Sequence, residues 1–281
     1  MSKPSAAEDG GDFTFFTQVV PEDVNDEQIP QPQAVDLGLA PKHPFRMVVT
    51  GASGQGKTTV ANHLLSKVYK GYFDKRIMFS PTAEWDPSWK SAKFKKSEIK
   101  EELDPDLLFE LYEEQEEKCK KDGAAKSPRV LLMFDDCIAD LRFMHSPEML
   151  KLFVQGRHCN ISLMMLTQSY MKVDRSCRLQ ATDILFFPSN LSEVDRLVKE
   201  HCPPNCSGRQ FKNLVMHATR KKHDFLNIGK RLEESEKFKR NFDTILEISG
   251  DTGFVDPDRR SRKRRRKKEA EAPGEAPEED L

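Results

Sequence analysis

The sequence predicts an α/β protein with a mostly parallel central sheet flanked by helices. Short apolar runs alternate with helical patterns between about residues 43 and 255. Most of these runs are continuously apolar, which is typical of strands buried on both faces. The expected strands are Phe45–Thr50, Arg76–Ser80, Val130–Phe134, Ile161–Thr167, Asp183–Phe187 and Asp224–Ile228, and the expected helices are Lys57–Lys70, Pro105–Lys121, Pro147–Gln155, Ser192–His201 and Gly208–Arg220.

Local signals support the individual elements in chain order. The first helix opens directly after a glycine-rich loop that follows the first strand. In the second helix, the apolar side chains between Leu107 and Tyr112 keep helical spacing, and the glutamates after them form a solvated face. Ser146 is a typical N-cap because Pro147 follows it at the first helical position. The tract 224–228 predicts a final sheet strand.

Charge is segregated along the chain although it nearly cancels in total. The 281 residues contain 45 Lys and Arg and 46 Asp and Glu, for a net charge of −1. Eight acidic residues and one basic residue precede position 42, whereas nine of the ten residues 259–268 are Lys or Arg. We therefore expect an acidic, proline-rich flexible arm at 1–42, a domain at 43–255 and a disordered basic, then acidic tail at 256–281.

Several protein classes are excluded by composition. No apolar run approaches the roughly 20 residues of a membrane-spanning helix. The acidic N-terminal region lacks the basic and then apolar order of a signal peptide. The six cysteines are spread thinly through a large chain, which indicates reduced thiols in an intracellular protein.

Residues 51–58 match the P-loop pattern G-x-x-x-x-G-K-[ST] in full, between a predicted strand and a predicted helix. Glycines let successive backbone N–H groups point inward around an anion, and the helix start adds positive charge. Lys57 is expected to reach the β- and γ-phosphates of ATP, and Thr58 to ligate Mg²⁺. The predicted nucleotide-binding residues are Gly51, Ala52, Ser53, Gly54, Gln55, Gly56, Lys57, Thr58 and Thr59.

Two acids end the apolar run that begins at Val130. Such a strand delivers carboxylates to the sheet edge beside the bound phosphates. We expect Asp135 to hold Mg²⁺, directly or through water, and Asp136 to polarise the attacking water. Many water-activating residues of this kind are glutamates, and Asp136 is one methylene shorter.

Three further side chains are candidates for catalysis. Gln168 ends the strand that begins at Ile161 and is expected to contact the γ-phosphate or the attacking water. Arg157 precedes that strand and Arg178 precedes the next one. Either arginine could stabilise charge on the transferred phosphoryl group in a neighbouring subunit, although an ordinary surface salt bridge is the competing interpretation.

The remaining features are less specific. The run 259–268 could be a nuclear import signal, a clamp on DNA phosphates, or a solvated tail. Basic residues between Arg220 and Arg231 could line a DNA track. Cys202 and Cys206 lack the spacing and the second pair of a zinc knuckle. Trp85 and Trp89 are expected to pack a loop rather than to stack on bases.

The P-loop, the Asp135–Asp136 strand end, and the segment from Gly156 through Gln168 together resemble the poxvirus-type DNA-packaging ATPases of the FtsK–HerA superfamily. The resemblance spans about residues 45–230. It implies a P-loop NTPase (ASCE/RecA-like) sheet with strand order 5-1-4-3-2 and the sensor strand in the middle. It also implies ATP hydrolysis that drives double-stranded DNA into a viral capsid or portal-like vertex, by a homo-oligomeric ring.

The sequence thus favours a packaging motor that uses ATP and Mg²⁺ and acts on duplex DNA without sequence preference. The expected location is intracellular, in the virion, the host nucleus or both. Two alternatives stay open: another P-loop enzyme such as a nucleotide or small-molecule kinase, and a DNA-binding structural protein with a vestigial nucleotide site. No lid rich in arginines supports a kinase, and the intact residues Lys57, Thr58, Asp135 and Asp136 oppose a vestigial site.

Overall fold

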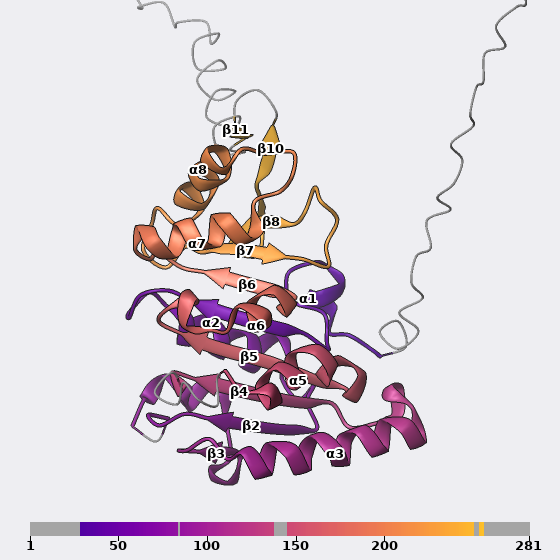
Figure 1. The fold of residues 1–281 in the computed structure, drawn as a ribbon. Helices are drawn as coiled ribbons and strands as arrows, with labels where there is room; N and C mark the ends of the chain where they lie inside the picture. The colour runs from indigo at the N-terminus through magenta and orange to yellow at the C-terminus, as the bar shows by residue number, and fades with distance from the viewer. Residues whose placement is uncertain (1–28, 84, 138–144, 250–252, 256–281) are drawn as a thin grey trace, which may run out of the picture.

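A computed structural model describes residues 29–83, 85–137, 145–249 and 253–255. In this part of the chain, nine strands form one sheet and two more form a separate hairpin. The strands are β1 Arg46–Thr50, β2 Lys75–Phe79, β3 Ile99–Lys100, β4 Val130–Asp135, β5 Ile161–Thr167, β6 Asp183–Phe186, β7 Leu226–Gly229, β8 Phe238–Arg240 and β9 Thr244–Ile245, with the hairpin of β10 Glu247–Ser249 and β11 Gly253–Val255. Figure 1 shows the sheet strands stacked above one another through the molecule.

The α-helices of the described residues are α1 Gln33–Asp36, α2 Lys57–His63, α3 Pro105–Asp122, α5 Pro147–Gln155, α6 Arg175–Gln180, α7 Leu191–His201 and α8 Gly208–Ala218. A π-helical turn, η1 Leu64–Val68, continues α2. The short 3₁₀ helices are η2 Pro87–Ala92, η3 Lys96–Glu98, η4 Ala124–Lys126, η6 Gly156–Cys159 and η7 Tyr170–Lys172. Ser146 caps α5 by accepting a hydrogen bond from the Met149 amide, with Pro147 at the first helical position, as the sequence predicts.

The sheet order is β3-β2-β4-β5-β1-β6-β7-β8-β9. The strands β1, β2, β4, β5 and β6 pair in parallel. Numbered one to five along the chain, these strands lie in the order 5-1-4-3-2 when read from β6 to β2. Because β5 lies between β1 and β4, the polar residues that follow these three strands meet at one edge of the sheet.

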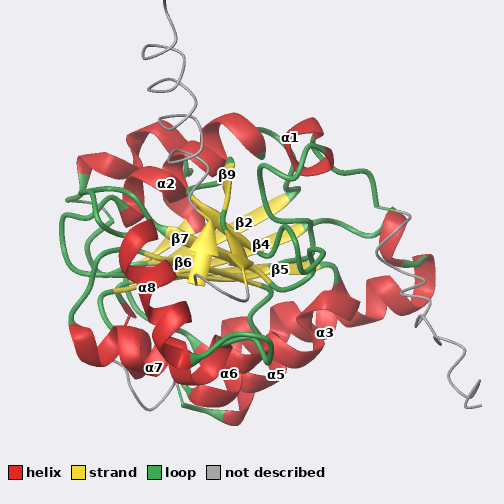
Figure 2. Ribbon diagram, turned by 90° about the horizontal axis from the view of Figure 1, so that it is seen from above, coloured by secondary structure: helices red, strands yellow, loops and turns green. Residues whose placement is uncertain are grey.

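Helices cover both faces of the sheet, as predicted. Figure 2 shows α1 and α2 on one side of the strands and α3, α5, α6 and α7 on the other. A hydrophobic core lies on each side: Phe45 and Val49 belong to the core on the α2 side, whereas Val48 and Phe134 belong to the core on the side of α3, α5 and α7. Alternate residues of each strand thus enter opposite cores, which explains why the strand sequences are continuously apolar.

The structure differs from the expectations in two places. Strand β7, predicted as a final strand, pairs antiparallel with β6, and the strands β8 and β9 extend this antiparallel edge. Residues 29–42, expected within the flexible arm, pack on the body: Ile29 is buried, and the Tyr72 hydroxyl donates to the Pro30 carbonyl at 2.8 Å. Residues 29–42 therefore belong with the folded domain. The predicted features at 1–28 and 256–281, including the basic run, lie outside the described residues.

Candidate active site

The loop between β1 and α2 has the backbone conformation of an anion nest. Gly51 has φ +151° and Gly56 has φ +105°, values that L side chains rarely adopt. A Cβ atom on Gly51 would lie 2.5 Å from the Cβ of Phe187, so a side chain has no room there. These glycines let the chain curl tightly at the carboxyl end of β1 before helix α2 begins at Lys57.

The ammonium group of Lys57 lies at the mouth of this loop. Its Nζ donates to the carbonyl of Gly51 at 2.7 Å and to that of Ala52 at 3.0 Å. Burial lowers the pKa of Lys57, and the carboxylates of Asp136 and Asp135 oppose this shift. The lysine is therefore held by its own loop and faces two acids across the site.

Asp135 is fixed at the end of β4 by two hydrogen bonds. Its Oδ2 accepts from the Trp89 indole Nε1 at 2.9 Å and from the Ser80 hydroxyl at 3.2 Å. The residue is only 7% exposed. Burial raises the pKa of Asp135, although both hydrogen bonds act in the opposite direction. A cation bound beside this carboxylate would be stabilised, because the buried anion lacks a full hydration shell.

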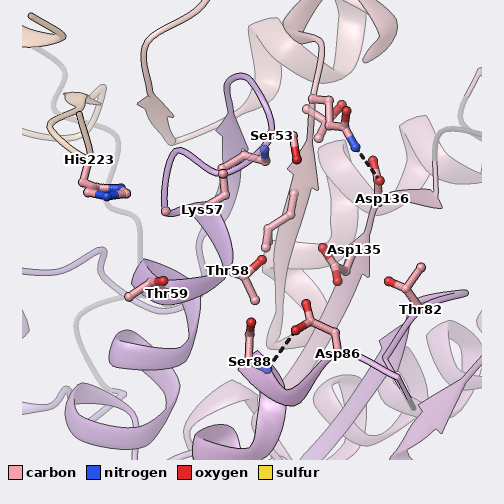
Figure 3. Close-up of a pocket in the computed structure, with 15 residues that line it drawn as sticks. Ser53, Lys57, Thr58, Thr59, Thr82, Asp86, Ser88, Asp135, Asp136 and His223 are labelled. Carbon is pink, nitrogen blue, oxygen red and sulfur yellow. Dashed lines mark hydrogen bonds between the residues drawn. The ribbon is translucent and has the colours of Figure 1, made fainter. Parts of the chain in front are cut away.

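Asp136 and Gln168 meet directly, because they follow two neighbouring parallel strands. Asp136 has φ +53°, and its amide donates to the Leu166 carbonyl on β5 at 3.1 Å. This left-handed turn directs its carboxylate toward the end of β5, where Gln168 Nε2 donates to Asp136 Oδ2 at 2.7 Å. The dashed line at Asp136 in Figure 3 marks this bond. The pair presents a carboxylate and an amide side by side.

These residues surround one cavity of about 360 Å³, which we call the P-loop cavity. Its size lies in the range of small-molecule sites. The lining residues are Ser53, Gly54, Gly56, Lys57, Thr58, Thr59, Thr82, Asp86, Ser88, Asp135, Asp136, Leu166, Thr167, Gln168 and His223. The structure thus brings together most of the predicted P-loop residues with both predicted carboxylates and Gln168. Gly51, Ala52 and Gln55 belong to the same loop but do not line the cavity.

The two predicted arginines lie elsewhere. Arg157 is in η6, which precedes the amino end of β5, so it is at the opposite edge of the sheet from the P-loop. Arg178 is buried: its guanidinium forms hydrogen bonds to Glu200 at 2.6 and 2.9 Å and to backbone carbonyls of residues 170, 171 and 173. The expectation that Arg178 serves a neighbouring subunit does not fit this arrangement, because its donors are used within its own fold.

Sequence reasoning missed six residues that line the cavity: Thr82, Asp86, Ser88, Leu166, Thr167 and His223. One signal was available, since Asp86 before Pro87 is a capping sequence, and Asp86 Oδ1 does accept from the Ser88 amide at 2.8 Å at the start of η2. His223 had none. Its Nδ1 donates to the Gln55 carbonyl at 3.0 Å across 168 positions of sequence.

The two tryptophans behave differently from each other. Trp89 is 4% exposed and packs under the loop, as expected, with its indole N–H on Asp135. Trp85 is 84% exposed, so the expectation that it packs a loop is wrong. The reason is that η2 begins at Pro87: Trp89 lies inside that helix and turns inward, whereas Trp85 precedes the helix.

All six cysteines are free thiols. In the described residues, no group of three or more His, Cys, Asp or Glu side chains could hold a metal ion. The hydroxyl of Thr58 and the carboxylate of Asp135 nevertheless lie on the same cavity, and they are the hard oxygen donors that Mg²⁺ uses together with substrate phosphates.

Comparison with known proteins identifies the family. The family described as Poxvirus A32 protein matches residues 38–229, which is more than half of the chain. The chain belongs to the Poxvirus A32 protein family. The matched region runs from the segment before β1 to the end of β7, so it contains the whole P-loop cavity.

Individual relatives agree with this assignment. The DNA packaging protein OPG160 of variola virus is 32% identical over 166 residues, which cover 56% of this chain and 58% of that protein. The protein of the same name from vaccinia virus strain Copenhagen gives the same values. The chain therefore matches somewhat more than half the length of these curated relatives.

A solved structure shows the same fold. It is B204, described as the DNA-packaging ATPase from Sulfolobus turreted icosahedral virus, with a TM-score of 0.50 and 18% identity over 70% of this chain and 96% of that chain. In the described residues of our protein, no helix is long and apolar enough to cross a bilayer.

Proposed function

We propose that this protein is an ATP-hydrolysing motor that moves double-stranded DNA into a viral capsid. The observation that carries the proposal is the P-loop cavity, in which Lys57 faces Asp135 and Asp136 and the second acid is paired with Gln168. Two further facts support it: the chain belongs to the Poxvirus A32 family, and its variola virus relative is named as a DNA packaging protein.

The P-loop residues bind the triphosphate of ATP. Backbone N–H groups between Gly51 and Thr59 point at the phosphate oxygens, and the ammonium of Lys57 exchanges its loop carbonyls for the β- and γ-phosphates. The hydroxyl of Thr58 and the carboxylate of Asp135 would hold the Mg²⁺ that accompanies the nucleotide. The ion would neutralise negative charge on the phosphates.

Asp136 orients the attacking water. The carboxylate accepts a hydrogen bond from this water and takes up its proton as the oxygen bonds to the γ-phosphorus. The bond between the γ-phosphorus and the bridging oxygen breaks, and ADP leaves with that electron pair. The Gln168 amide, held 2.7 Å from Asp136, positions the carboxylate and lies where it can also contact the water.

An arginine from a neighbouring subunit completes the site in a homo-oligomeric ring. Of the two arginines predicted from the sequence, Arg157 is the candidate that we retain, because it is half-exposed in η6, whereas Arg178 is buried in its own subunit. Its position at the opposite sheet edge suits a residue that reaches across an interface rather than into its own cavity. Hydrolysis is then coupled to movement between subunits.

The partners of the motor are duplex DNA, held by its phosphates without sequence preference, and a capsid or portal-like vertex. The site of action is inside an infected cell, where capsids are filled, and in the virion. The basic run 259–268, which lies outside the described residues, is a candidate contact for DNA or for import receptors.

ATP turnover by the purified protein, measured with and without duplex DNA, tests this function. Stimulation by DNA is the expected result. Transfer of the γ-phosphate to a small acceptor, with no effect of DNA, would instead identify a kinase. Absence of turnover in every oligomeric state would leave a DNA-binding protein with an inactive nucleotide site.

A further inference from the structure

Trp85 precedes Asp86 of the P-loop cavity and is far more exposed to solvent than a large apolar side chain usually is. Trp85 is 84% exposed, and the next large apolar side chain in the described part of the chain, Leu37, is 64% exposed. An exposed tryptophan keeps a large apolar face in water, which is typical of residues that contact a partner. The amide of Trp85 donates to the Thr82 carbonyl at 3.0 Å, so the backbone that carries it is held in a turn.

Trp85 lines a cavity whose lining also includes three lysines. This cavity has a volume of about 490 Å³, and Lys90, Lys93, Phe94 and Lys96 belong to its lining. All three lysines are exposed, while Phe94 is half-buried with the Arg76 guanidinium 4.6 Å from its ring centroid. Asp86 is the one acid among the described lining residues. We call Trp85, Lys90, Lys93, Phe94 and Lys96 the Trp85 surface.

We propose that the Trp85 surface is where the motor contacts DNA, with strand phosphates on the lysines and the indole against a base or sugar. This proposal rests on the proposed function. Charge complementarity favours DNA, because three exposed lysines line the same cavity as the exposed Trp85 indole. Phosphate contacts combined with aromatic stacking are the usual means of holding a nucleic-acid strand.

A short helix joins this surface to the P-loop cavity. Lys90 and Trp89 are adjacent in η2, and the Trp89 indole donates to Asp135 at 2.9 Å. At the start of the same helix, Asp86 and Ser88 line the P-loop cavity. The Ser88 carbonyl also accepts a hydrogen bond from the Asn62 side chain of α2.

A displacement of η2 by DNA would therefore move groups bonded to both the metal-binding carboxylate and the P-loop helix. This gives DNA contact a direct physical route to the nucleotide, and it explains how DNA would stimulate turnover.

Intrinsic fluorescence of the full chain tests the proposal, because the protein has two tryptophans and only Trp85 is exposed. Adding a short random-sequence duplex, or the corresponding single strand, is expected to quench the emission of the wild-type protein. The change is expected to be much smaller in a Trp85→Phe variant, in which only the buried Trp89 emits. Comparing the two oligonucleotides shows which form of DNA the indole contacts. Trp85→Ala is expected to weaken DNA binding by roughly tenfold.

The lysines are tested by the salt dependence of binding. Each phosphate contact contributes about 0.9 to the slope of the logarithm of the DNA-binding constant against the logarithm of the salt concentration. Replacing Lys90, Lys93 and Lys96 with alanine is therefore expected to reduce the magnitude of this slope by about 2 to 3. The matched control replaces Lys120, Lys121 and Lys126, which are exposed in the region of α3 and η4, and is expected to change the slope little.

Failure of this proposal is distinguishable from failure of the proposed function. If DNA stimulates turnover but neither DNA form changes Trp85 emission, the contact lies elsewhere, for example at Arg220–Lys222, and the motor stands. Quenching by poly-glutamate but not by DNA would also overturn the proposal and would indicate an acidic protein partner. If DNA has no effect on ATP turnover, the result contradicts the proposed motor function.

Discussion

Replacing Arg178 with alanine is expected to destabilise the fold rather than to remove a group that serves a neighbouring site. The side chains of Arg178 and Glu200 are 5% and 3% exposed, and they are joined by hydrogen bonds of 2.6 and 2.9 Å. Burial favours a raised pKa for Glu200, but hydrogen bonds from Arg178 and Tyr170 outweigh it and lower this pKa. Glu200 is thus a buried anion that needs its partner.

Removing one partner of a buried ion pair costs about 3–5 kcal/mol of unfolding free energy. This is a large share of the about 5–15 kcal/mol that stabilises a typical domain. In a domain of this size it lowers Tm by roughly 6–20 °C, at about 2–4 °C per kcal/mol. Replacing both Arg178 and Glu200 with methionine is expected to recover much of the loss, because no unpaired charge is then buried.

Urea unfolding followed by circular dichroism measures these effects. The matched control is Arg175→Ala, an exposed arginine of the same helix, for which a change within about 0.5 kcal/mol is expected. The reasoning is refuted if Arg178→Ala is as stable as the control but lacks ATP turnover, and if turnover returns on mixing with a Lys57→Ala subunit.

Three further results are expected. Burial lowers the pKa of His201 to about 3 in the fold. Since this value lies below the unfolded one, stability is fully present above about pH 6.5 and falls as the pH drops toward 3, and a His201→Gln variant should show a shallower loss in urea unfolding between these limits. Gly51→Ala should abolish binding of a fluorescent ATP analogue, because its Cβ would overlap Phe187; unchanged affinity would contradict the loop geometry. Mixing Arg157→Ala with Lys57→Ala subunits should partly restore turnover, and no rescue would count against a shared site.

Features encoded by neighbouring residues could be predicted from the sequence. Helix α5 begins and ends where its capping serine and periodicity place it. The meeting of Asp136 with Gln168 follows from two strand ends, because neighbouring parallel strands deliver their following residues to one edge. The β7 strand was also found, but its antiparallel direction depends on the path of the connection that precedes it, which local sequence does not specify.

Features that depend on distant contacts could not be predicted. An arginine before a strand looks the same in sequence whether it is buried, as Arg178 is, or half-exposed, as Arg157 is. The hydrogen bond from Trp89 to Asp135 spans 46 positions, and the one from His223 to Gln55 spans 168. Such contacts are fixed by the packing of the whole sheet, and no pattern in either segment indicates them.

The measurement that most directly tests how this site works is ATP binding and single-turnover hydrolysis by Asp136→Asn, an isosteric change that keeps the turn and removes the proton acceptor. Binding of ATP should match the wild-type protein, while the rate of hydrolysis should fall by roughly 10²–10⁴-fold, the usual contribution of general base catalysis. Hydrolysis at the wild-type rate would show that the carboxylate beside Gln168 does not activate the water.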